Sequence, residues 1–236
     1  MSGQVKLGFG DRGLSAIAHA ETGTLLCRDG RTATLGPPVV EWHDADRSWR
    51  ARVDGGFDVV LRPLGEPAQF ADGSQEWLCE VDGAADGTPI DCLGHIVLAG
   101  DGPPTDWRKT GLERGVAAWF AADLAFAVHA RRPARADAHE AEALEAIVLR
   151  GEPPAPVAID DPRLSTAYDG DGRARRAGLE LWETEESDFA LRLAAETIGE
   201  GELVLPGGAV VRSAFLLWRY DGMVGTGRYD IGLAPR

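Results

Sequence analysis

The run Val39-Val40-Glu41-Trp42, followed by Phe57-Asp58-Val59-Val60-Leu61-Arg62, has a counterpart in the second half of the chain. There, Leu179-Glu180-Leu181-Trp182 is followed by Asp188-Phe189-Ala190-Leu191-Arg192-Leu193. Each copy carries a Glu and a Trp on a strand-like run, and then an acidic residue, a Phe and a Leu-Arg pair. Self-similarity of this kind predicts one β unit that is used twice. We therefore expect one compact unit with two halves, residues 1–110 and 111–236.

Turn signals between the apolar runs predict the fold class. Gly accepts the positive φ that tight hairpin turns require, so an Asp-Gly pair between alternating runs indicates a hairpin. Such pairs recur along the whole chain: Asp29-Gly30, Asp54-Gly55, Asp72-Gly73, Asp82-Gly83, Asp86-Gly87, Asp101-Gly102, Asp169-Gly170 and Asp221-Gly222, with Gly207-Gly208 in addition. An antiparallel, all-β protein of many short strands follows. Residues 213–220 are apolar on both faces, as expected for a central strand or a barrel wall.

Two segments are compatible with helix as well as strand. Val116, Phe120, Leu124 and Val128 have helical spacing, but a hairpin of residues 114–120 and 124–131, turning at 121–123, is favoured. Residues 138–149 are rich in helix formers and could form either a strand or one short helix. Prolines interrupt the chain at Pro103-Pro104 and at 151–156, the best candidate junction, and we place the boundary between the halves between these two interruptions.

Composition restricts the partners and the compartment. The net charge of −14 disfavours nucleic acid and anionic membranes, which require basic patches, and favours a neutral or apolar small molecule. We see neither a signal peptide at residues 1–10 nor an apolar run long enough for membrane insertion. Three cysteines indicate a reduced, cytoplasmic protein, although Cys79 and Cys92 would face each other if a hairpin turned near Ala85-Asp86.

Familiar catalytic signatures are absent from the sequence. It contains no phosphate-binding loop and no GxSxG nucleophile motif, and Gly222, Gly225 and Gly227 have the spacing of a last tight hairpin instead of a dinucleotide site. The five histidines show neither HxH nor HxxxH spacing, so we expect no metal and no cofactor.

A pocket is nevertheless compatible with several residues. On the hairpin interpretation His129 shares a strand face with Ala125, Ala127 and Arg131, and small side chains leave volume for a ligand; close packing against another strand is the alternative. His95 lies in an apolar run and is more typical of a core residue. Three glutamates, namely Glu41, Glu76 and Glu180, lie within two residues of a Trp. A carboxyl held against an indole in a dry cavity would have a raised pKa and could act as a general acid.

Two segments resemble a known family. Residues 100–108, which end in Asp106-Trp107-Arg108, resemble the Asp-His-Ser-Trp-Gly-x-Arg segment of the lipocalin-like carotenoid hydratases (hydroxyneurosporene synthase), without its His and Ser. Residues 220–227 resemble the aromatic and Gly-x-Gly ending of that family's second barrel. The resemblance implies two calycin-type barrels in tandem. It also implies water addition to isoprenoid double bonds or, as in fungal polyketide relatives, pericyclic cyclisation.

We therefore expect two lipocalin-like half-barrels packed as one unit. The first hypothesis is a cofactor-independent enzyme that hydrates, isomerises or cyclises a hydrophobic small molecule, an isoprenoid or a polyketide. In this hypothesis Asp106 or Glu180 is the acid and His129 is a base or hydrogen-bond partner. The ligand contacts would come from aromatic residues and one arginine, namely Trp107, Trp119, Trp182, Trp218, Tyr220 and Arg131. The alternative is a non-catalytic carrier with an apolar pocket.

Overall fold

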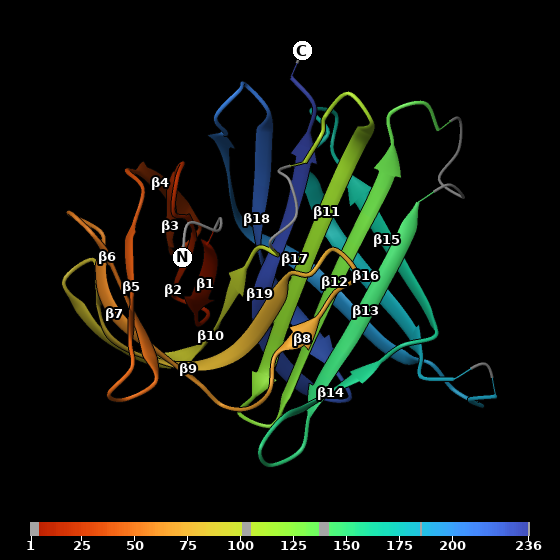
Figure 1. Cartoon of the computed structure of the whole chain (residues 1–236), viewed down its shortest axis with the longest axis horizontal. Helices are drawn as coiled ribbons and strands as arrows, with labels where there is room; N and C mark the ends of the chain where they lie inside the picture. Colours follow the sequence, from red (N-terminus) through yellow and green to blue (C-terminus); the bar gives the residue numbers. More distant parts are fainter. Residues whose placement is uncertain (1–4, 101–104, 137–141, 185, 236) are drawn as a thin grey trace.

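The computed structural model describes residues 5–100, 105–136, 142–184 and 186–235, and every helix or strand within them is a β-strand (Figure 1). The prediction of an antiparallel all-β fold is confirmed. The segment for which a short helix was an alternative forms a strand from Ala143 to Arg150, while its residues 138–141 lie outside the described part. No helix in the described residues has the length and apolar character of a membrane span.

The strands form two sheets. The first sheet has ten strands: β1 (Val5–Gly10), β2 (Leu14–His19), β3 (Gly23–Arg28), β4 (Arg31–Leu35), β5 (Val39–His43), β6 (Ser48–Val53), β7 (Phe57–Pro63), β8 (Ala68–Gln69), β9 (Gln75–Ala85) and β10 (Thr88–Leu98). The second has nine: β11 (Thr110–Ala121), β12 (Leu124–Pro133), β13 (Ala143–Arg150), β14 (Ala155–Ala158), β15 (Asp161–Tyr168), β16 (Ala174–Trp182), β17 (Leu191–Val204), β18 (Val210–Tyr220) and β19 (Met223–Leu233).

The two sheets have the same strand order. The first runs β4-β3-β2-β1-β10-β9-β7-β6-β5, with β8 paired to β9, and the second runs β14-β13-β12-β11-β19-β18-β17-β16-β15. Each sheet curls into a half-barrel, so the β unit that the sequence pattern predicted is used twice. The pattern itself is only partly equivalent in structure. Residues 57–62 and 191–193 lie on the matching strands β7 and β17, but Glu41-Trp42 lies on β5 and Glu180-Trp182 on β16, the counterpart of β6.

Several turns agree with the sequence and others differ. The hairpin of β11 and β12 turns at residues 122–123, as predicted. Asp86 and Gly87 both have positive φ and turn β9 into β10, and this register pairs Cys79 with Gly94 and Cys92 with Val81, so the cysteines are not opposite each other and are free thiols. The Pro-rich stretch 151–156, the candidate junction of the halves, lies inside the second sheet: residues 151–154 form the turn from β13 to β14, and 155–156 begin β14.

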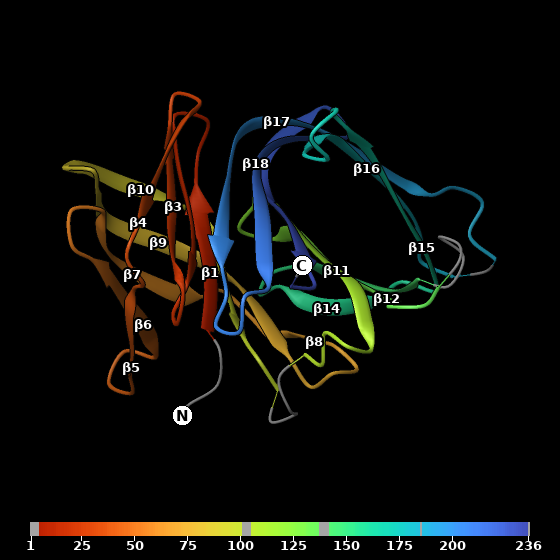
Figure 2. The same cartoon turned by 90° about the horizontal axis from the view of Figure 1, so that it is seen from above.

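Alternation along the strands gives each half-barrel an inner and an outer face. The inner faces are packed with apolar side chains, among them Trp49 in the first half-barrel and the fully buried Trp218 and Tyr229 in the second. The two half-barrels lie side by side (Figure 2). The outer faces of strands from both sheets meet in an interface, where β1 contacts β19, β10 contacts β11 and β3 contacts β17. Two apolar clusters lie in this interface, one around Trp119 and Leu149 and one around Phe215 and Ile17.

Candidate functional site

Ionisable side chains are buried in the interface between the two half-barrels. They come from both sheets and are at most 6% exposed: His19 on β2, Glu76 on β9, His95 on β10, and Arg228 and Asp230 on β19. Buried charge is costly unless it is paired, and groups with shifted pKa values that lie beside a cavity are candidates for catalysis. This cluster is therefore the main candidate for a functional site.

Strand alternation on β19 sends the charged side chains toward the first sheet. Arg228 and Asp230 point into the interface, whereas Gly227 and Tyr229 point into the second barrel. A Cβ atom on Gly227 would lie 2.0 Å from the backbone oxygen of Ala117, so glycine is required there for β19 to lie this close to β11. The close approach of these two strands fixes where Arg228 enters the interface.

His95 has a partner at each ring nitrogen, and the one at Nε2 belongs to the other sheet. The Arg228 Nε group donates a hydrogen bond of 2.7 Å to His95 Nε2, which therefore carries no proton. The remaining proton of the neutral ring is on Nδ1, which lies 2.7 Å from Glu76 Oε1. Burial lowers the pKa of His95, the carboxylate of Glu76 opposes this, and the charge of Arg228 adds to it. The imidazole is held neutral in a single tautomer.

Glu76 is ionised although it is only 2% exposed. Burial by itself would raise the pKa of this carboxyl, but the two histidines and Arg228 outweigh burial and hold it well below its usual range. The expectation of a raised pKa beside an indole is therefore wrong for Glu76. Its Oε2 atom accepts no hydrogen bond from the described residues and lies 3.6 Å from His129 Nε2 and 3.9 Å from an Arg228 nitrogen. This oxygen is available as a proton acceptor.

The other end of the cluster is organised around Asp230. Burial would raise the pKa of Asp230, yet Arg228, which donates a hydrogen bond to it, and His19 lower it. Burial and the nearby Lys6 lower the pKa of His19 to about 3, so this imidazole is neutral at physiological pH. Arg228 thus lies between the carboxylates of Glu76 and Asp230, and its positive charge compensates the negative charge of both.

A small cavity adjoins the Glu76 end. Its volume is about 10 Å³, which is room for about one water molecule. Small and apolar side chains form most of its wall, together with Glu76 and His95: Leu78, Ala117, Trp119, Ala125, Ala127 and Leu149. The Trp119 ring stacks on His95 with 5.3 Å between centroids, and its Nε1 donates to the Gly10 oxygen at 3.4 Å.

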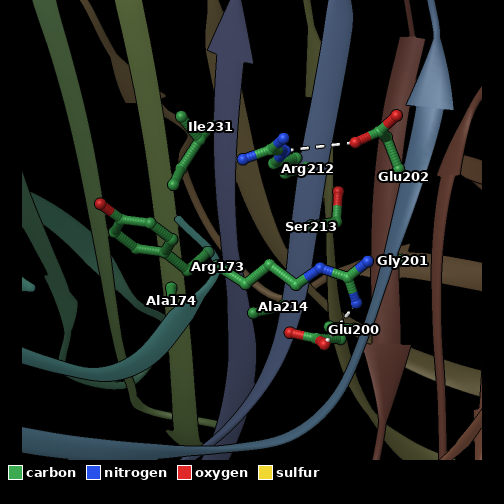
Figure 3. A pocket seen from close by; sticks show the side chains of 10 residues that line it. Arg173, Ala174, Glu200, Gly201, Glu202, Arg212, Ser213, Ala214 and Ile231 are labelled. Carbon is green, nitrogen blue, oxygen red and sulfur yellow. Dashed lines mark hydrogen bonds and ion pairs between the residues drawn. The ribbon is translucent and has the colours of Figure 1, made fainter. Parts of the chain in front are cut away.

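A larger cavity of about 60 Å³ lies at one end of the second barrel (Figure 3). The charged side chains that line it form ion pairs, Arg173 with Glu200 at 2.7 Å and Arg212 with Glu202 at 3.2 Å. Tyr229 also borders it, and its hydroxyl lies 2.9 Å from the Thr166 hydroxyl. Arg173 is 53% exposed and Glu202 50%, so water screens these charges. The interface cluster, which is dry, is better suited to proton transfer.

The structure separates the three side chains expected to be catalytic. His129 lies in the interface beside Glu76, with its side chain 22% exposed. Asp106 is 50% exposed and caps a turn by accepting a 3.1 Å hydrogen bond from the Arg108 backbone. Glu180 is 46% exposed on the outer face of β16, 3.5 Å from Arg192. Neither carboxylate is in a dry pocket where it would stay protonated.

The residues expected to contact a ligand are also divided. Trp119 and Arg131 lie on the interface side of their strands, whereas Trp218 and Tyr220 lie inside the second barrel. Trp182 is on the outer face of β16 under the guanidinium of Arg163, 4.4 Å from its ring centroid. The remaining one, Trp107, packs against Gly232.

Sequence reasoning missed Arg228, Asp230 and His19. The signal for Arg228 and Asp230 is the alternation of polar with small or aromatic residues from Thr226 to Asp230, of which sequence reasoning used only the glycines, as the end of a hairpin. Gly222 does form that turn, but Gly225 and Gly227 lie inside β19. Among the described residues, no group of three or more His, Cys, Asp or Glu side chains is arranged to hold a metal ion.

Comparison with known proteins gives likeness of structure only. No protein-family model matches the sequence, and no curated protein matches it. Kievitone hydratase from Nectria haematococca is 11% identical, with 99% of this chain and 90% of that chain covered and a TM-score of 0.63. CghA is 12% identical, with coverage of 99% and 88% and a TM-score of 0.61. CghA with Sch210972 is 13% identical, with coverage of 99% and 89% and a TM-score of 0.54. These likenesses confirm the expected two-half-barrel fold over the whole chain.

Proposed function

We propose that the chain is a cofactor-independent enzyme that moves a proton on an apolar small molecule at the interface of its two half-barrels. The observation that carries the proposal is the Oε2 atom of Glu76. It belongs to a buried, ionised carboxylate, accepts no hydrogen bond from the described residues, and lies 3.6 Å from a histidine. A general base must be deprotonated at the working pH and must lie within hydrogen-bond reach of the proton that it takes.

Each neighbour has a separate task in this proposal. His95 lies 2.7 Å from Glu76 Oε1, and Arg228, which donates to His95, lies 3.9 Å from Oε2 and helps to keep the carboxylate charged, so both are positioning residues. His129, which is partly exposed, passes protons between Glu76 and solvent. Trp119 and the alanines around it exclude water and contact the apolar body of the substrate.

An ionised Glu76 favours base chemistry over protonation of an isolated alkene. In an isomerisation, Oε2 removes a proton from the carbon beside a carbonyl and returns it at another carbon of the resulting enolate. In a hydration, Oε2 takes a proton from water as the water oxygen bonds to the β-carbon of an enone, and the α-carbon is then protonated through His129. A substrate with a carbonyl conjugated to unsaturation, as in polyketide and aryl ketone compounds, fits this chemistry better than an isoprenoid hydrocarbon. The structurally similar kievitone hydratase is by its name a hydratase, which supports hydration as one of the two reactions.

Deuterium exchange tests the proposal without knowledge of the natural substrate. The protein is incubated in D2O with a panel of aryl enones and 1,3-diketones, and mass spectrometry measures deuterium gain on carbon and addition of D2O. We expect Glu76→Gln to lower the rate on an accepted compound by about 10²- to 10⁴-fold. His129→Gln should slow exchange less, and added imidazole should restore it.

The control separates catalysis from folding. Glu196→Gln changes a carboxylate that is 63% exposed and should leave exchange unchanged. Melting curves must show that the Glu76→Gln protein is folded, and Glu76→Asp, which keeps the charge, should retain partial activity. Undiminished exchange in folded Glu76→Gln protein would refute the proposal. Binding of panel compounds without any exchange by the wild type would favour the carrier alternative.

A further inference from the structure

The connection from β7 to β9, residues 64–74, crosses from the first sheet onto the second. We name it the strap. Its short strand β8 pairs with β9 through two residues only, and it also contacts β13 and β14 (Figure 1). The Glu66 backbone nitrogen donates to the Pro154 oxygen at 3.2 Å. The strap therefore covers the interface beside the cavity that Glu76 borders.

Phe70 of the strap lies face to face with His129. The ring centroids are 3.6 Å apart and the planes differ by 9°, so the two flat rings are in full contact. Phe70 is only 5% exposed and joins the apolar cluster of the cavity wall, which includes Ala117, Ala127 and Leu149. The aromatic side of the proposed proton carrier is thus covered by a side chain that belongs to a loop.

The strap is held down by polar contacts that are inexpensive to break. Arg131, 52% exposed, forms an ion pair of 2.8 Å with Asp72, and the Ala71 backbone nitrogen donates to Glu145 at 2.8 Å. Exposed ion pairs of this kind contribute little to stability. Only Ala68, Phe70 and Ser74 of the strap are buried. Segments with few buried contacts open at a lower free energy than the whole fold.

We propose that Phe70 holds the place of a ligand: the strap lifts, and a planar, unsaturated part of an apolar molecule stacks on the His129 imidazole instead. Only a flat π system can copy a parallel contact at 3.6 Å, since a saturated ring is thicker and lacks the offset-stacking attraction. The cavity of about 10 Å³ holds only about one water molecule, so the substituents would occupy the space that Phe70 and the lifted strap leave. The ligand would then lie beside Glu76 Oε2, which is 3.6 Å from His129. The inference extends the proposed function by naming the substrate's shape and its route of entry.

A cross-linked strap provides the test. In an Ala71→Cys/Glu145→Cys variant, a methylene-bridged bis-thiosulfonate reagent ties the strap to β13, and dithiothreitol releases it. Titration calorimetry measures binding of 2-naphthol and of its saturated counterpart, decahydro-2-naphthol. We expect the tied protein to bind 2-naphthol at least about tenfold more weakly than the released protein, because the open state is no longer populated. Each single-cysteine variant, treated with the same reagent, is the control.

Nuclear magnetic resonance shows whether Phe70 leaves His129. The ring current of Phe70 shifts the His129 carbon-bound protons upfield, and Phe70→Leu gives their reference position. Saturating 2-naphthol should change these resonances in the released protein and not in the tied protein, while decahydro-2-naphthol should bind more weakly. Equal affinity in tied and released protein, equal affinity for both probes, or unchanged His129 resonances would overturn the inference. The same titrations in Glu76→Gln protein should give the same result, so failure of the catalytic proposal and failure of the strap proposal are distinguishable.

Discussion

Replacement of Arg228 by Met tests the electrostatic account of the interface most directly. The guanidinium donates to His95 at 2.7 Å, donates to Asp230 and lies 3.9 Å from Glu76. Methionine keeps much of the side-chain volume and removes the charge and every hydrogen bond. Two carboxylates that are at most 6% exposed then lose a compensating positive charge, which for Asp230 is the largest one.

The expected loss is large for a single substitution. Removing one partner of a buried ion pair costs about 3–5 kcal/mol, because the other charge stays buried and unpaired. At about 2–4 °C per kcal/mol for a chain of this size, the melting temperature should fall by roughly 6–20 °C. Because Arg228 joins the second sheet to His95 of the first, the loss should also separate the unfolding of the two half-barrels.

The loss should depend on pH in a defined direction. In the wild type the pKa values of Glu76 and Asp230 lie below those of the unfolded chain, so their contribution is present above the unfolded pKa and is lost as pH falls through the folded one. Without Arg228 one of the groups that oppose burial is gone, so both folded pKa values rise and the two carboxylates contribute less stability above the unfolded pKa. The difference between the two proteins therefore shrinks on acidification, by up to about 1.4 kcal/mol per pH unit for each carboxylate.

Urea unfolding at pH 7 and pH 5, followed by tryptophan fluorescence, measures both effects. Arg176→Met is the matched control, since this arginine is 74% exposed and 3.9 Å from its partner Glu196. The Arg176→Met substitution should leave the free energy of unfolding nearly unchanged at both pH values. A penalty for Arg228→Met below about 1 kcal/mol at pH 7, or one that does not shrink at pH 5, would refute the reasoning.

Two further predictions concern the same interface. The folded-state pKa of His19 is lowered to about 3 from 6.5, so wild-type stability should fall as pH drops from 6.5 toward 3, and His19→Gln should remove part of that slope in urea titrations. An unchanged slope would contradict a buried, neutral imidazole. Gly227→Ala should destabilise by about 1–3 kcal/mol, because the new Cβ would meet the Ala117 oxygen at 2.0 Å. Gly170→Ala, with open space around it, should be nearly neutral in the same thermal melts. Equal melting temperatures for the two glycine variants would show that β19 can move away from β11.

The fold was predictable where local signals agree with the tertiary structure. The hairpin of β11 and β12 has both a turn at Asp123 and alternating faces, and both are local. Residues 143–150 form a strand against their helix propensity because both faces are covered: Ala146 and Val148 lie inside the second barrel, while Ile147 and Leu149 lie in the interface. No local pattern contains the information that a second barrel covers the outer face.

The site was less predictable than the fold. Sequence reasoning identified His129 from its small neighbours and included Glu76 among the glutamates near tryptophan. It assigned the acid to Asp106, from the resemblance of residues 100–108 to the hydratase segment, or to Glu180, because a tryptophan close in sequence indicates an indole nearby. Neighbours along a strand point to opposite faces, so the Trp77 ring packs in the first barrel while Glu76 points into the interface. The decisive partner, Arg228, is 133 residues from His95 and reaches it only when the sheets are packed together.

The shared strand order explains why the ionic residues meet where they do. The two sheets can be aligned by their registers, because the last residue of β10 pairs with Val5 and the last residue of the matching strand β19 pairs with Leu112. In this alignment Lys6 is equivalent to Glu113, and His95 is equivalent to Asp230. β1 is equivalent to β11, and β10 is equivalent to β19, so the contact of β1 with β19 and the contact of β10 with β11 are related by a pseudo-twofold axis. In such an isologous interface, residues near the axis lie close to the equivalent residues of the other half. Burial lowers the pKa values of both Lys6 and His95, and each partner is close enough to oppose this, Glu113 at Lys6 and Asp230 at His95. Two identical halves would bring lysine to lysine and carboxylate to carboxylate across this axis. The buried site is stable because the halves have become chemically unlike at these positions, which makes it a property of their pairing and of neither half alone.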